Sequence, residues 1–212
     1  MRHAAIAPRE EITSLSVPGN LFPKIKAIVP KDIKIEKLEA MGSGKIPLLI
    51  YTTSKGRCST LLSKAQFLAC LECFLAIKQQ KSCSAISYEI RETGVAVETE
   101  TGKYFIAASE IKAFLERYNR ASLDKLEVEL TAISAVVRNG IKGTVNEVNK
   151  LGCNCPDTIY RHTICKHQIA VHVRLNRLGW GSMGAYLQEN QGAKWEEKLL
   201  RMAREAKADL GC

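Results

Sequence analysis

Residues 153–167 read CNCPDTIYRHTICKH, a C-x-C pair followed after nine residues by a C-x-H pair. Three thiols and one imidazole are donors that a tetrahedral metal ion takes from a protein, with sulfur at about 2.3 Å and nitrogen at about 2.0 Å. We therefore predict that Cys153, Cys155, Cys165 and His167 hold one ion. Because four protein donors would leave no position for water or substrate, the predicted metal is structural.

The residues around the two pairs support this geometry. Pro156 and Asp157 predict the tight turn that lets the first two thiols meet one ion. A helix is expected from Lys166 to about Leu178, and the N–H groups at its start favour a thiolate at Cys165. His162 is an alternative fourth ligand, while His172 is expected to be a packing or surface residue.

The spacing resembles the SWIM zinc finger, whose pattern is C-x-C, a variable spacer, and C-x-H. This chain supplies Cys153-Asn-Cys155-Pro-Asp and Cys165-Lys166-His167-Gln-Ile-Ala-Val. The resemblance covers about residues 131–178 and implies a small ββα module with one structural Zn²⁺ held by Cys153, Cys155, Cys165 and His167. It also favours His167 over His162 and implies binding to DNA or to proteins, in recombination, transposition or a related assembly. Residues 1–130 resemble no family that we recognise.

A β-hairpin is expected directly before the first cysteine pair. Two runs, Thr131–Arg138 and Ile141–Asn149, are joined by Asn139-Gly140, a strong signal for a two-residue hairpin turn. The hairpin lies where the SWIM pattern places its strands.

The rest of the chain predicts an α+β fold, with an antiparallel sheet flanked by helices. A strand is expected at Ile46–Thr53, and a helix from Leu61 to about Gln79 buries Cys70 and Cys73. Three strands with tight turns follow, and a helix capped by Ser109 comes next.

Four segments are predicted along the chain. Residues 1–60 form an irregular basic arm with a short strand near Ile25–Val29, and residues 61–130 form an α+β domain. The zinc module spans 131–178, and a helical segment with an amphipathic run from Lys194 to about Leu210 spans 179–212.

The charge lies in two blocks. The chain of 212 residues has 31 Lys and Arg against 22 Asp and Glu, a net charge of +9. Residues 1–60 carry ten basic against five acidic side chains, and residues 138–178 carry seven against two, whereas the segments between and after them are nearly neutral. Localised positive charge attracts phosphate polyanions, so we expect nucleic acid as a partner, with DNA favoured over RNA.

Six basic residues are candidate phosphate contacts. Lys166, Arg174 and Arg177 share one row of the expected helix with Ala170, opposite its apolar row, and this basic row is expected to be exposed. The hairpin and the spacer add Arg138, Lys142 and Arg161. The alternative is a protein-interaction adaptor, one subunit of a larger complex, in which these charges are only a solvated surface.

Other classes of function have less support in the sequence. Hydrophobic residues make up 46% of the chain, which is typical of globular domains. There is no P-loop, G-x-S-x-G or H-E-x-x-H motif, so no enzyme is predicted. No secretory leader and no run of about 18 apolar residues is present, so we expect no membrane partner and a cytoplasmic location, or a nuclear one in a eukaryote.

Overall fold

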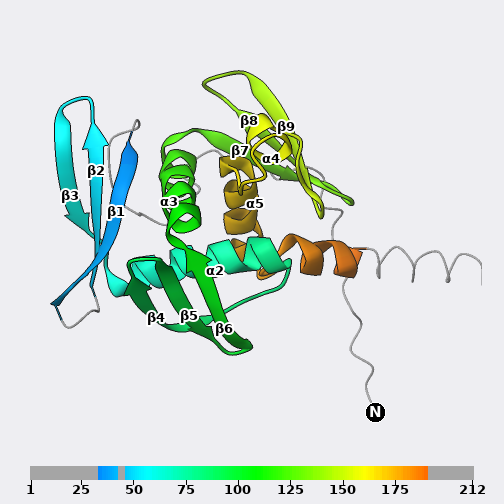
Figure 1. Cartoon of the computed structure of the whole chain (residues 1–212). Helices are drawn as coiled ribbons and strands as arrows, with labels where there is room; N and C mark the ends of the chain where they lie inside the picture. The colour runs from blue at the N-terminus through cyan, green and yellow to red at the C-terminus, as the bar shows by residue number, and fades with distance from the viewer. Residues whose placement is uncertain (1–32, 43–45, 191–212) are drawn as a thin grey trace, which may run out of the picture.

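The computed structural model describes residues 33–42 and 46–190, and the α+β prediction is confirmed (Figure 1). The strands form three antiparallel sheets, which we name A, B and C. Sheet A contains β1 (Lys34–Met41), β2 (Ile46–Thr53) and β3 (Gly56–Leu61); sheet B contains β4 (Ala85–Arg91), β5 (Gly94–Thr99) and β6 (Gly102–Ala107); sheet C contains β7 (Leu126–Leu130), β8 (Ala135–Asn139), β9 (Thr144–Asn149) and β10 (Gly152–Cys153). The helices are α2 (Lys64–Gln79), α3 (Ala108–Leu123), α4 (Pro156–Ile159) and α5 (Lys166–Arg177).

Sheet A corrects the prediction of an irregular arm over residues 1–60. From Lys34 onward this segment is a regular three-stranded sheet, and only β2 has its predicted bounds. A register shift between Ile35 and Lys37 breaks the two-residue alternation of β1, which is why the sequence pattern did not predict that strand. The strand expected near Ile25–Val29 lies outside the described residues.

The two long helices form largely as predicted. Ser63 caps α2 through a capping box with Gln66, and Phe67, Cys70 and Cys73 are buried as predicted. The predicted cap at Ser109 is wrong, because α3 starts one residue earlier and its N-cap, Ala107, makes no side-chain hydrogen bond. The N–H of Ala108 instead donates to the carbonyl of Thr93, 2.9 Å away, in the turn before β5.

Sheet C contains the predicted hairpin, but its turn is longer than two residues. The last paired residues are Asn139 and Thr144, so residues 140–143 form the connection. The buried Asn139 stabilises it, because its side-chain Oδ1 accepts from the backbone N–H groups of Ile141 and Lys142 at 3.0 and 3.1 Å. The first strand begins at Ala135 rather than near Thr131.

Helix α5 joins the hairpin to the rest of the molecule. It packs against α2, α3 and sheet C, and the buried residues form one hydrophobic core that runs from Ile33 to Leu187 (Figure 1). The core therefore continues across residue 130, where two predicted segments meet. Residues 183–190 are helical, and the helix expected from Lys194 lies outside the described residues. No described helix has the length and apolar character needed to cross a bilayer.

Candidate metal centre

The four predicted ligands lie together. Cys153, Cys155, Cys165 and His167 are all buried, and their ligand atoms lie within 4.8 Å of one another. They reach this point from two sides, the first pair from the end of sheet C and the second from the start of α5. The fold therefore brings Cys153 and His167, which are 14 residues apart in the sequence, together in the core.

Sheet C and α4 position the first pair. Cys153 pairs with Val148 in the short strand β10, and Cys155 is the N-cap of α4, with Pro156 at the first helical position. Gly152 has a φ of +139°, and a side chain there would place its Cβ 3.0 Å from the methyl group of Thr158. A glycine at this position therefore lets the strand pass close to α4.

The N-terminus of α5 positions the second pair. Cys165 is the N-cap, and its Sγ accepts from the backbone N–H of Gln168 at 3.4 Å. The Gln168 side chain returns the contact, because its Oε1 accepts from the Cys165 N–H at 3.0 Å. This is a capping box with a thiol in place of a hydroxyl, and it holds the sulfur where the helix dipole stabilises negative charge.

Hydrogen bonding within the cluster shifts the pKa values of two of its thiols in opposite directions. A hydrogen bond from the Cys153 thiol, with smaller contributions from His167, Gln168 and Thr158, lowers the pKa of Cys165 to about 4 despite its burial. The same hydrogen bond, together with burial, raises the pKa of Cys153. A lowered pKa at Cys165 favours the thiolate there, and thiolate is the form that binds a metal.

One ring nitrogen of His167 faces the cysteine cluster, and the other faces a polar side chain. Its Nδ1 lies 3.7 Å from the Sγ of Cys153, and its Nε2 lies 3.3 Å from the side-chain amide of Asn146 on β9. The atom of Asn146 that faces Nε2 in the structure is the amide nitrogen; with the amide oxygen and nitrogen exchanged, the oxygen would accept from Nε2–H and leave Nδ1 free to bind a metal. Outer partners of this kind orient metal-binding histidines.

The spacing of the donors fits a tetrahedral ion. Bond lengths of about 2.3 Å to sulfur and 2.0 Å to nitrogen place a sulfur and a nitrogen on the same ion roughly 3.5 Å apart. The observed separation between Cys153 and His167 is 3.7 Å. The four buried side chains can therefore hold a metal ion without a large rearrangement.

The competing ligands that the sequence left open are not at the site. His162 is exposed, has a φ of +50° and is not part of the cluster. Burial raises the pKa of Cys70 to about 12 and also raises that of Cys73, as expected for core thiols. Among the described residues, no second group of three or more His, Cys, Asp or Glu side chains has a geometry that could hold a metal.

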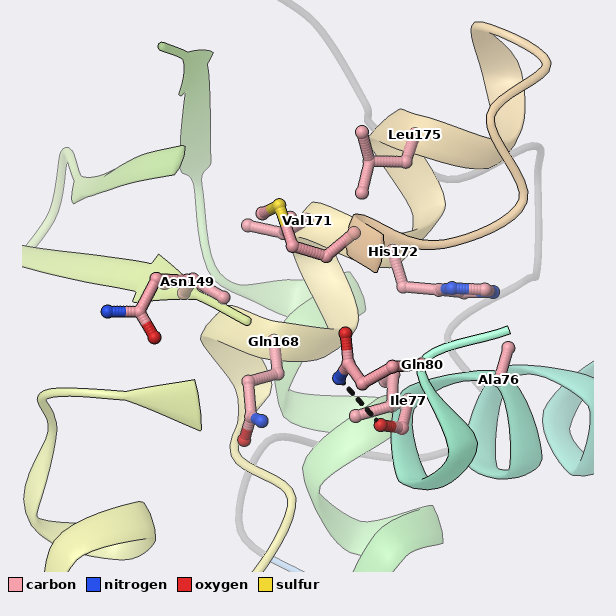
Figure 2. A pocket seen from close by; sticks show the side chains of 10 residues that line it. Ala76, Ile77, Gln80, Asn149, Gln168, Val171, His172 and Leu175 are labelled. Carbon is pink, nitrogen blue, oxygen red and sulfur yellow. Dashed lines mark hydrogen bonds between the residues drawn. The ribbon is translucent and has the colours of Figure 1, made fainter. Parts of the chain in front are cut away.

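His172 is a buried packing residue behind the site. It lines a small pocket of about 20 Å³ between α2 and α5, together with Gln80 and Gln168 (Figure 2). Burial lowers the pKa of its imidazole to about 4, so the ring is neutral at pH 7. Gln80 donates from Nε2 to the carbonyl of Ile77 at 2.8 Å, and its buried Oε1 has no hydrogen-bond partner within the described residues.

The predicted exposure of the basic row on α5 is wrong for two of its three cations. The Lys166 ammonium pairs with the carboxylate of Asp124 at the end of α3, and Arg174 is only 9% exposed. Ala170 between them is fully buried. The basic row is not exposed as predicted because α5 packs against α2, α3 and sheet C, which leaves little of the helix surface open to solvent.

The other candidate phosphate contacts are exposed. Arg177 ends α5 and Lys142 lies in the hairpin turn, and neither makes an ion pair with a described residue. Arg138 pairs with Glu129 at 3.5 Å, and Arg161 pairs with Asp157 at 2.6 Å, but both cations face solvent. The structure therefore does not gather all six residues on one surface.

Sequence reasoning missed the residues that support the ligands. The capping role of Gln168 could have been inferred, because it stands three residues after the cap at Cys165. Nothing in the sequence indicated Asn146 or Asp124, which lie 21 and 42 residues from their partners His167 and Lys166.

Comparison of the chain with models of protein families, with curated proteins and with solved structures finds no match. The likeness to the SWIM zinc finger therefore rests on the ligand spacing, together with the hairpin before it and the helix after it.

Proposed function

We propose that the metal is Zn²⁺ and that the module around it is of the SWIM type. Three cysteines and one histidine form a soft, four-donor set of the kind that structural zinc sites use, and all four donors belong to the protein. Binding of the ion would release the protons still on the cysteine thiols and would link sheet C to α5. Its role would be to hold the fold together, with no catalytic step.

On this scaffold we propose a nucleic-acid-binding accessory function, with DNA as the preferred partner and with a place in recombination, transposition or a related process. The observation that carries the proposal is the surplus of exposed cations in the segment of the chain that contains the metal ligands. The segment from 138 to 178 has seven basic residues and only two acidic ones. Five of the seven basic residues are exposed: Arg138, Lys142, Lys150, Arg161 and Arg177.

These contacts would position the protein on the phosphate backbone rather than read bases. The test is the binding of the zinc-loaded chain to labelled single- and double-stranded DNA at about 50 and 200 mM salt. We expect affinity to fall by an order of magnitude or more between the two salts, and the combined variant Lys142→Gln, Lys150→Gln and Arg177→Gln to bind more weakly with a shallower salt slope.

A matched control neutralises three exposed lysines outside the metal module, Lys81, Lys103 and Lys64, and is expected to bind as the wild type does. Equal loss in both triple variants would show that net charge alone drives binding. No binding at the lower salt would sink the nucleic-acid proposal.

The second candidate is a protein-interaction adaptor whose metal centre is purely structural. The observation that favours it is an apolar surface on sheet A that no described residue covers, where Met41, Ile46 and Leu61 are each about half exposed, at 46%, 46% and 55%. This surface lies far along the chain from the metal centre and does not depend on it.

A further inference from the structure

The spacer between the two ligand pairs, residues 156–164, exposes an aromatic ring. Tyr160, directly after α4, is 78% exposed and is the most exposed aromatic side chain among the described residues. A ring so open to solvent contributes little to the packing of the fold. Most of its surface is therefore free to contact a ligand.

Hydrogen bonds hold the spacer in one conformation. The N–H of Tyr160 donates to the carbonyl of Pro156 at 3.0 Å. The N–H and the hydroxyl of Thr163 both donate to the carbonyl of Asp157, at 3.2 and 3.1 Å. The Asp157 carboxylate in turn lies 3.9 Å from the Nε of Arg117 on α3. A ring presented on a fixed loop loses little conformational freedom when it binds a partner.

The ring lies in a positively charged part of the chain. Arg161, the next residue, pairs with Asp157 at 2.6 Å through Nη1, yet its side chain is still 69% exposed. Lys150 is exposed in the turn before β10, the strand that passes close to α4. Asp157 is the only acidic residue between positions 150 and 163. An aromatic ring among cations is the arrangement with which proteins bind single-stranded nucleic acid.

The metal module has less to offer a duplex. A protein reads the major groove of a duplex with a helix or a two-stranded ribbon, but α5 packs against α2, α3 and sheet C, and α4 is a single turn. The outward face of the β8–β9 hairpin and the adjoining β7 is acidic, because the strand registers place three glutamates and one arginine on it: Glu127, Glu129, Glu147 and Arg138. This face repels phosphates, so the spacer is the favoured contact.

We propose that the spacer binds single-stranded DNA, with one unpaired base stacked on the ring of Tyr160 and a neighbouring phosphate on Arg161. This inference rests on the nucleic-acid function proposed above and names the form of DNA that the protein prefers. Every base has a π face, so the contact is independent of sequence. In a duplex both faces of a base are covered by its neighbours in the stack, so a duplex cannot make this contact.

The test is fluorescence anisotropy of the full-length, metal-loaded chain at about 50 mM salt with three labelled DNAs of about 20 nucleotides: a single strand, its duplex, and an abasic strand that keeps the phosphates. We expect the single strand to bind at least about fivefold more tightly than the other two. Tyr160→Ala should weaken binding of the single strand about tenfold and leave the abasic strand unchanged, whereas Tyr160→Phe, which keeps the ring, should bind within about twofold of the wild type.

Arg161→Gln separates the charge from the ring. It should weaken the single strand and the abasic strand equally and reduce the salt slope by about one. The matched control is Phe105→Ala, at a ring on sheet B that is 54% exposed, and it should bind as the wild type does. Circular dichroism of each variant shows whether it is folded.

The outcomes distinguish this inference from the function on which it rests. A wild-type chain that binds all three DNAs equally, or a Tyr160→Ala variant that binds the single strand normally, would overturn the stacking proposal and leave nucleic-acid binding in place. Equal losses in Tyr160→Phe and Tyr160→Ala would also overturn it, because the hydroxyl rather than the ring would then make the contact. No binding to any of the three DNAs would overturn both.

Discussion

At the scale of single residues, the lysine inside the C-K-H sequence is a structural side chain. Lys166 lies between two ligands and pairs with Asp124, whose side chain is only 4% exposed. A charge as buried as that of Asp124 is costly without its partner. The ion pair therefore ties the metal loop to the junction of α3 and β7.

We predict that Lys166→Met lowers the free energy of unfolding by about 3 kcal/mol, because it removes the cation that pairs with the buried carboxylate of Asp124. Arg177→Met, on the exposed last turn of the same helix, is the control and should change stability by less than about 0.5 kcal/mol. Urea denaturation of the two variants measures both values. Equal effects would contradict the structural role of Lys166.

His172 gives the protein a pH dependence of known sign. Its pKa is lowered from 6.5 to about 4 by burial, so the unfolded chain takes up a proton at a higher pH than the folded one. Its contribution to stability is thus complete above pH 6.5 and is lost as the pH falls toward 4, up to about 3 kcal/mol in all.

The variant His172→Gln isolates this contribution, because glutamine does not titrate. The difference in unfolding free energy between wild type and variant should be constant above pH 7 and should shrink as the pH falls from 6.5 to 4. The two proteins share the metal ligands, so acid release of the metal affects both. A difference that does not change with pH would show that the folded imidazole titrates normally.

At the scale of elements, the sequence predicted those parts whose pattern is local. The stripe at Ile111, Phe114 and Leu115 identified α3, and regular alternation identified β2. The metal cluster was predictable for a similar reason, because its four ligands lie within 15 residues; their spacing names the three cysteines, and the resemblance to the SWIM pattern selects His167 over His162.

The elements that sequence reasoning missed depend on distant contacts. In β1 the bulge after Ile35 hides the alternation, and the strand is identified only by its pairing with β2. The basic row on α5 looked exposed because a helical period shows which residues share a face but not what covers that face. Asp124 and the neighbouring helices cover it, and they come from segments more than 40 residues away.

At the scale of the whole molecule, the metal ligands belong to the main core. Cys153, Cys155 and Cys165 are members of the same buried cluster as Phe67 and Phe114 in the two long helices. Loss of the metal should therefore destabilise more of the fold than the hairpin and α5.

We predict that a chelator lowers the melting temperature of the entire described fold in a single calorimetric transition. The reason is that the loop holding the ligands shares its packing with α2 and α3, so it cannot melt alone without exposing their apolar faces. Two separate transitions, one sensitive to chelator and one not, would show that the metal module folds independently.

The central claim is that Cys153, Cys155, Cys165 and His167 hold one metal ion, and its most direct test is the metal content of the native protein. Native mass spectrometry of the full chain, with elemental analysis of the same sample, should find one zinc ion per chain. Cys165→Ser should lose it, while Cys58→Ser, at an exposed cysteine outside the cluster, should retain it. A folded wild-type chain that carries no metal after expression and purification with zinc present, or a Cys165→Ser variant that keeps its full equivalent, would contradict the claim.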